Sequence, residues 1–167
     1  MAFTTLPAAG APLRGSVLSS LLTEVRALEA YKTADETVNG SAALQNDNEL
    51  FVVVAANARY DFELRIVHNS GTTPDFKFGW TFPTGTTMFY NQLNVPLAGS
   101  AFALFAQIQT DTPQGEGAAA DRGIHAWGKV LVGTTAGTLQ FQWAQSTSNG
   151  SDTIVRAGSY LTLRRTS

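Results

Sequence analysis

Two runs of alternating residues follow one another from Ala58 to Phe82, where the sequence reads ARYDFELRIVHNSGTTPDFKFGWTF. In the first run residues 60, 62, 64 and 66 are apolar, and the residues between them are charged. Successive side chains of a β-strand point to opposite faces, so this run predicts a strand with one face for a core and one for water. The second run places four aromatic rings on one face, at Phe76, Phe78, Trp80 and Phe82. Each ring removes about 150–250 Å² from water on burial, so the stretch predicts a second sheet packed over the first.

Shorter runs of the same kind continue along the chain and are separated by turn residues. We expect strands within residues 37–45, 49–55, 58–69, 75–82, 86–95, 101–110, 123–132, 138–147 and 152–165, with a flexible loop over 111–122. The dipeptide Asn149-Gly150 is a strong hairpin signal, so the last two strands are expected to pair. Many short strands at near-regular spacing are typical of antiparallel sandwiches. The sequence therefore predicts an all-β fold, with a jelly-roll-like antiparallel β-sandwich over residues 37–167.

The first part of the chain has a different character. Residues 1–15 hold prolines and glycines among small residues, which predicts an extended N-terminal arm without a core of its own. Ser16 is a suitable helix N-cap, and one short α-helix is expected over residues 16–31. Its apolar positions have heptad spacing and are Leu18, Leu21, Val25 and Leu28.

This apolar stripe has two interpretations. It can pack on the sandwich of its own chain, or it can form a contact between copies around a three-fold or two-fold axis. Helices shorter than about 12–15 residues are marginal on their own, so either arrangement needs support from the sandwich.

The composition limits the classes of partner. Charged residues make up 14% of the chain, against about 25% in typical soluble domains. A surface with so little charge suits a virion or extracellular protein, or a chain that hides its surface in an assembly. The formal net charge of −2 argues against nucleic acid, since phosphate binding needs clustered cations. No secretory signal is expected at the start, and no run approaches the roughly 20 apolar residues of a membrane helix.

The sequence offers no residues with the spacing of a catalytic or metal site. His68 and His125 stand outside any ligand spacing, and the chain has no cysteine and no Gly-x-Ser-x-Gly elbow for a nucleophile. The acidic residues of the loop at 111–122 lack the fixed separation that glycoside hydrolysis requires. We therefore expect no enzymatic activity, no metal and no cofactor.

The three tryptophans divide by strand face. Trp80 and Trp143 alternate in register with other apolar residues and are expected in the core. Trp127 shares a face with His125 and Lys129, so it is the best candidate for an exposed contact. A subunit contact and a sugar-binding shelf are both compatible with that position.

Several ordered phrases connect the chain to a known group of proteins. They are TLP at 5–7, APLR at 11–14, KTADETVN at 32–39, NSGTTPDFK at 69–77, GTLQFQWAQ at 137–145 and GSYL at 158–161, with Arg164 and Arg165 beyond. In these phrases the chain resembles small virion structural proteins of tailed bacteriophages that infect actinobacteria.

The resemblance implies a non-enzymatic piece of the particle, such as a capsid decoration protein, a head fibre or a minor tail protein. Members are commonly β-sandwich trimers. The leading hypothesis is a homotrimeric decoration (cement) protein that binds the major capsid protein and stabilises the exterior of the capsid. Its subunit or capsid interface is expected at the helical stripe (Leu18, Leu21, Val25, Leu28) and at Trp127. The alternative is a tail-fibre or baseplate module that recognises host cell-surface glycans, and a cell-wall hydrolase is a third class.

Overall fold

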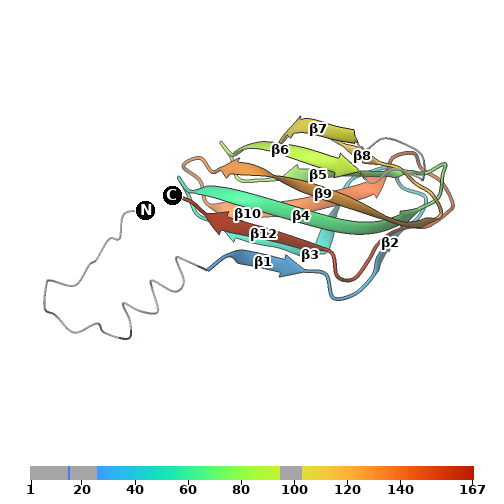
Figure 1. The fold of residues 1–167 in the computed structure, drawn as a ribbon, viewed down its shortest axis with the longest axis horizontal. Coiled ribbons are helices and arrows are strands. Elements are labelled where there is room, and N and C mark those ends of the chain that lie inside the picture. Colours follow the sequence, from blue (N-terminus) through green and yellow to red (C-terminus); the bar gives the residue numbers. More distant parts are fainter. Residues whose placement is uncertain (1–14, 16–25, 95–102) are drawn as a thin grey trace, which may run out of the picture.

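A computed structural model of the chain describes residue 15 and the ranges 26–94 and 103–167. In these ranges the chain is all β, with antiparallel strands in two sheets (Figure 1). The strands are β1 (Leu28–Tyr31), β2 (Glu36–Val38), β3 (Gln45–Val54), β4 (Arg59–Ser70), β5 (Phe76–Thr81), β6 (Thr87–Asn94), β7 (Ala103–Ile108), β8 (Gln114–Gly115), β9 (Ala120–Leu131), β10 (Gly137–Gln145), β11 (Thr153–Val155) and β12 (Tyr160–Arg165).

The two sheets differ in size. The large sheet has the order β1-β12-β4-β9-β6-β7, and β11 pairs both with the end of β4 and with β2. The small sheet has the order β3-β10-β5-β8. Consecutive strands from β3 to β6 lie alternately in the small and the large sheet, so the chain crosses between layers at nearly every turn. This arrangement confirms the predicted antiparallel β-sandwich.

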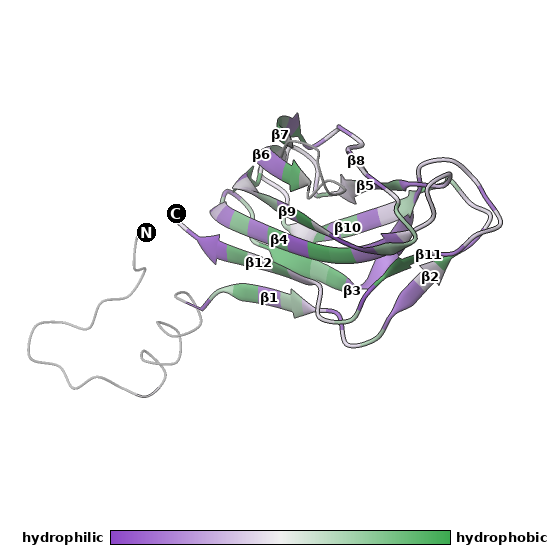
Figure 2. Cartoon of the chain, turned by 45° about the vertical axis from the view of Figure 1, so that its right-hand side comes forward, coloured by the Kyte–Doolittle hydropathy of each residue, from purple (hydrophilic) through white to green (hydrophobic). Residues whose placement is uncertain are grey.

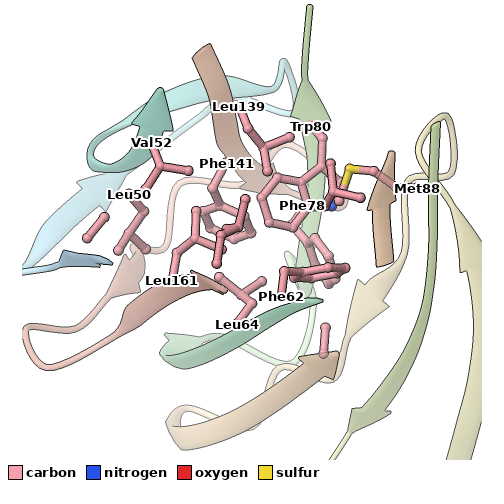
Figure 3. Packing of buried hydrophobic residues seen from close by; sticks show 14 of the residues in the cluster. Leu50, Val52, Phe62, Leu64, Phe78, Trp80, Met88, Leu139, Phe141 and Leu161 are labelled. Atoms are coloured by element: carbon pink, nitrogen blue, oxygen red, sulfur yellow. The ribbon is translucent and has the colours of Figure 1, made fainter. Parts of the chain in front are cut away.

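The core lies between the sheets and follows the predicted faces. Tyr60, Phe62 and Leu64 of β4 are buried, and Phe78 and Trp80 of β5 are buried opposite them. The rings of Phe62 and Trp80 meet edge to face across the layers, with centroids 5.8 Å apart. Figure 3 shows Phe62 and Leu64 from the large sheet facing Phe78 and Trp80 from the small sheet. Each fully buried side chain of this size contributes about 1.5–3 kcal/mol to stability, so this interface holds the sandwich together.

The predicted hairpin at Asn149-Gly150 is wrong. β10 pairs with β3 and β5 in the small sheet, whereas β11 and β12 belong to the large sheet. Both edges of β10 are therefore occupied, and the turn carries the chain from one sheet to the other. Neither residue has the positive φ that a type I′ hairpin turn demands.

The predicted helix over 16–31 is wrong at its C-terminal end. Leu28–Tyr31 form β1, which pairs with β12 in the register Leu28↔Leu163. Pairing satisfies the open edge of β12 and lets Leu28 pack against the core. The sandwich therefore includes residues before the predicted start at 37. Leu18, Leu21 and Val25 lie outside the described residues.

The loop predicted over 111–122 is partly regular. It contains β8, which pairs with β5, and the first residues of β9. The backbone hydrogen bonds from Ala118 and Ala119 to the Ser70 carbonyl, 2.9 and 2.8 Å long, tie the loop to the end of β4.

Candidate functional site

The outer face of the large sheet carries a row of polar side chains that includes a tryptophan. The register places Glu29 of β1, Thr162 of β12, Glu63 of β4 and Trp127 of β9 side by side across four strands. These residues border an open hollow of about 620 Å³, here called the Trp127 hollow. Its side chains include Glu29, Asp61, Glu63, Arg65, His125, Trp127, Thr162 and Arg164.

Trp127 differs from the other two tryptophans in its surroundings. Trp80 and Trp143 are buried, as predicted, whereas Trp127 is half-buried on the outer face. The His125 ring lies beside the indole at a centroid distance of 4.8 Å and a tilt of 38°. Because the two residues are two positions apart on one strand, they share a face.

Ion pairs hold the carboxylates of the hollow in place. Oε1 of Glu63 accepts hydrogen bonds from Arg65 Nε at 2.8 Å and from the Tyr160 hydroxyl at 3.3 Å. The same oxygen lies 3.1 Å from Nε2 of His125. Asp61 accepts from Lys129 and from Arg164. These bonds orient the side chains without burying them.

The pairs also keep both carboxylates ionised. For Glu63, partial burial opposes ionisation, but the hydrogen bond and charge of Arg65 outweigh it and lower the pKa. For Asp61, the hydrogen bond from Lys129 is the main cause of a lowered pKa. The hollow is therefore a surface of fixed, opposite charges around one aromatic ring.

A second exposed feature lies at one end of the same sheet. Phe89 of β6 and Leu104, Phe105 and Ile108 of β7 have exposed fractions of 57%, 61%, 47% and 42%. The register sets Phe89 opposite Ile108, so these two share the outer face. β7 ends the strand order of the large sheet (Figure 2). We call this group of four side chains the β7 edge.

The sequence reasoning missed the β7 edge. The alternation of Leu104, Ala106 and Ile108 predicts a strand but does not tell an inner strand from an end strand. The sequence does contain one indication of this edge. Residues 103–108 read ALFAQI and are apolar at both odd-numbered and even-numbered positions. Such a run has no face suited to water, which indicates a covered strand or an interface.

A cluster of polar side chains and a single histidine lie inside the sandwich. The buried Lys32 donates to Asp47 at 2.8 Å and to Glu36 at 2.6 Å, and Asp47 also accepts from Trp143 Nε1 at 3.1 Å. His68 is buried on the core face of β4 and stacks on Phe76 at 4.4 Å. The polar cluster connects the end of β1 to the small sheet, which is a structural role.

Of the predicted interface residues, the structure describes Leu28 and Trp127, and these two lie on opposite faces of the large sheet. Trp127 lines the hollow, whereas Leu28 packs against the core and borders a smaller depression of about 320 Å³ with Val53, Tyr60 and Arg165. Over residues 26–94 and 103–167, no group of three or more His, Asp or Glu side chains could hold a metal ion. No helix in these ranges is long and apolar enough to cross a membrane.

Comparison with known proteins gives a weak structural likeness. No protein-family model matches the chain, and no curated protein matches it. Among solved structures, it is similar to a chain of the tripod from the baseplate of bacteriophage Tuc2009, with 14% sequence identity and a TM-score of 0.32. The alignment covers 98% of this chain and 75% of the other. A likeness of this strength assigns neither a family nor a function.

Proposed function

We propose that the protein is a non-enzymatic structural component of a bacteriophage particle, and that its copies associate through the β7 edge. The observation that carries the proposal is the set of large apolar side chains left exposed on an end strand. The resemblance of its sequence phrases to small phage virion proteins supports the choice of particle.

End strands with exposed apolar side chains favour association. Their free N–H and C=O groups can pair with another chain, and natural proteins commonly protect such edges with charged residues. β7 carries no charge. Leu104 and Ile108 lie on the outer face, whereas Phe105 is paired with Gln92 of the core face of β6. Because apolar groups lie on both faces, a neighbouring copy has to enclose the strand.

The assembly we propose is a homotrimer. In a ring around a three-fold axis, the β7 edge of each copy contacts the next copy. The ring closes after three copies, so no β7 edge remains exposed. The finer proposal is a capsid decoration protein that sits on the exterior of the shell. By binding the major capsid protein only in the assembled shell, it would stabilise the capsid through mass action.

The oligomeric state tests the first part of the proposal. We expect light scattering at micromolar concentration to give the mass of a trimer for the unaltered chain. The double variant Leu104→Asp/Ile108→Asp should be a monomer, because it places charges in the enclosed surface. The control Val53→Asp alters an exposed apolar residue of β3 in the small sheet and should remain a trimer.

A capsid assay tests the second part. The unaltered protein should sediment with capsids that lack it and should raise their melting temperature. Near-ultraviolet circular dichroism checks that the variants are folded. A strict monomer that leaves capsids unbound would refute the proposal.

A further inference from the structure

The residues of the Trp127 hollow have no role in the proposed association of copies through the β7 edge. It places one half-buried aromatic ring on the outer face of β9, beside carboxylates from β1 and β4 and guanidinium groups from β4 and β12. Its volume of about 620 Å³ falls in the range of small-ligand sites, about 300–1,000 Å³. We propose that this hollow binds a neutral saccharide, which is an activity beyond the proposed role in assembly.

The aromatic ring supplies the first part of the recognition. One face of a pyranose ring is lined by C–H groups, which are apolar and weakly positive. The face of an indole ring carries partial negative charge, so the two faces attract each other when stacked. Trp127 is the half-buried tryptophan of the three, whereas Trp80 and Trp143 are occupied in the core.

The charged side chains around Trp127 supply the second part of the recognition, which is hydrogen bonding to the sugar hydroxyls. A sugar hydroxyl both donates and accepts, whereas a carboxylate only accepts and a guanidinium only donates. Glu63 makes its polar contacts through Oε1, which leaves Oε2 to accept from a ligand hydroxyl. Arg65 uses Nε in its pair with Glu63, which leaves its terminal nitrogens to donate. Adjacent hydroxyls can therefore be bound as a pair.

The charge balance selects a neutral ligand. Glu29, Asp61 and Glu63 are matched by Arg65 and Arg164 in the hollow and by Lys129, which pairs with Asp61 at its border. The formal sum is zero. An anionic polymer would need an excess of cations, and a cationic ligand would need an excess of carboxylates. Hydroxyl groups gain from both signs of charge at once.

The ion pairs also prepare the site in advance. Asp61 is held by two cationic side chains, and Glu63 is held by Arg65 and Tyr160. A ligand therefore meets side chains that are already oriented, which reduces the entropy lost on binding. The hollow lies over β1, β12, β4 and β9, and β6 separates β9 from β7. Variants at Trp127 and variants at Leu104 and Ile108 of β7 therefore test the two surfaces separately.

The test begins with an array of neutral mannose, glucose, galactose and rhamnose oligosaccharides, with sulfated and sialylated glycans as charged comparators. The 167-residue chain should bind one or more neutral glycans. Each glycan that binds is then titrated into protein with ¹⁵N-labelled tryptophan. We expect the indole signal of Trp127 to shift, while those of Trp80 and Trp143 stay in place.

Variants assign the binding to the hollow. Trp127→Ala should weaken binding by at least about tenfold through loss of stacking, and Trp127→Phe should restore part of it. Glu63→Gln should also weaken binding, whereas the control Phe51→Ala, at an exposed ring of β3, should not. Absence of binding to every neutral glycan, binding of charged glycans alone, or equal affinity in Trp127→Ala would each overturn the proposal.

Discussion

Acidification should destabilise the protein through one buried histidine. His68 has an exposed fraction of 1%, and its ring stacks on Phe76 in the core. Burial, reinforced by the nearby charge of Arg122 and only partly offset by Asp121, lowers the pKa of His68 from 6.5 to about 4. His68 therefore binds a proton less readily in the folded protein than in the unfolded chain.

The sign and size of the effect follow from this difference in pKa. The contribution of His68 to the free energy of unfolding is fully present well above pH 6.5, where the side chain is neutral in both states. As the pH falls, the unfolded chain binds the proton first, so the free energy of unfolding decreases until the pH reaches the folded pKa of about 4. At about 1.4 kcal/mol for each unit of pKa difference, the total loss is about 3 kcal/mol. That is a large part of the roughly 5–15 kcal/mol of a typical domain.

Urea unfolding followed by tryptophan fluorescence measures this dependence. Between about pH 7 and pH 4.5, the free energy of unfolding should fall by about 2.5 kcal/mol in the unaltered chain. His68→Gln, which cannot titrate, should have a much flatter profile over that interval. The control Phe51→Ala, which changes an exposed ring of β3 and no titratable group, should keep the slope. An unchanged slope in His68→Gln would show that other groups cause the acid sensitivity.

Two further substitutions test the interior, each by urea unfolding. Lys32→Met should cost about 3–5 kcal/mol because it leaves the charge of Asp47 buried without its cation, whereas Lys129→Met, in an exposed pair, should cost less than about 1 kcal/mol. Similar losses in the two variants would contradict this. Gly128→Ala should cost about 1–3 kcal/mol or more, because the added Cβ would lie 2.1 Å from a backbone oxygen of β6. Gly150→Ala has open space and should be nearly neutral; equal losses would refute the close approach of β6 to β9.

The accuracy of the sequence predictions depended on the range of the interactions involved. The faces of β4 and β5 were predicted correctly, because alternation with period two is a property of neighbouring residues. The heptad spacing through Leu28 is equally local, yet residues 28–31 form a strand. Pairing with β12, far along the chain, outweighed the local pattern. The hairpin predicted at Asn149-Gly150 was wrong for a related reason. β3 and β5 occupy both edges of β10, so the strand that follows the turn cannot pair with β10.

The candidate sites show the same difference between local patterns, which the sequence reveals, and contacts between distant strands, which it does not. The position of Trp127 away from the core followed from the strand pattern alone. Nothing in the sequence brings Glu29, Glu63 and Thr162 to the same row as Trp127, because these residues come from four strands that the register aligns. Likewise, the apolar character of residues 103–108 is plain in the sequence, but its exposure depends on the place of β7 at the end of the sheet.

The sequence by itself determined that this chain forms a two-layered antiparallel sandwich, and it determined which faces of the main strands are buried. Burial of alternating apolar residues is favourable whichever strands become neighbours. The tertiary structure alone decided which strands pair, which apolar strand ends the sheet, and which polar side chains meet in the Trp127 hollow. These outcomes depend on contacts between distant segments, whose free energies no short stretch of sequence contains.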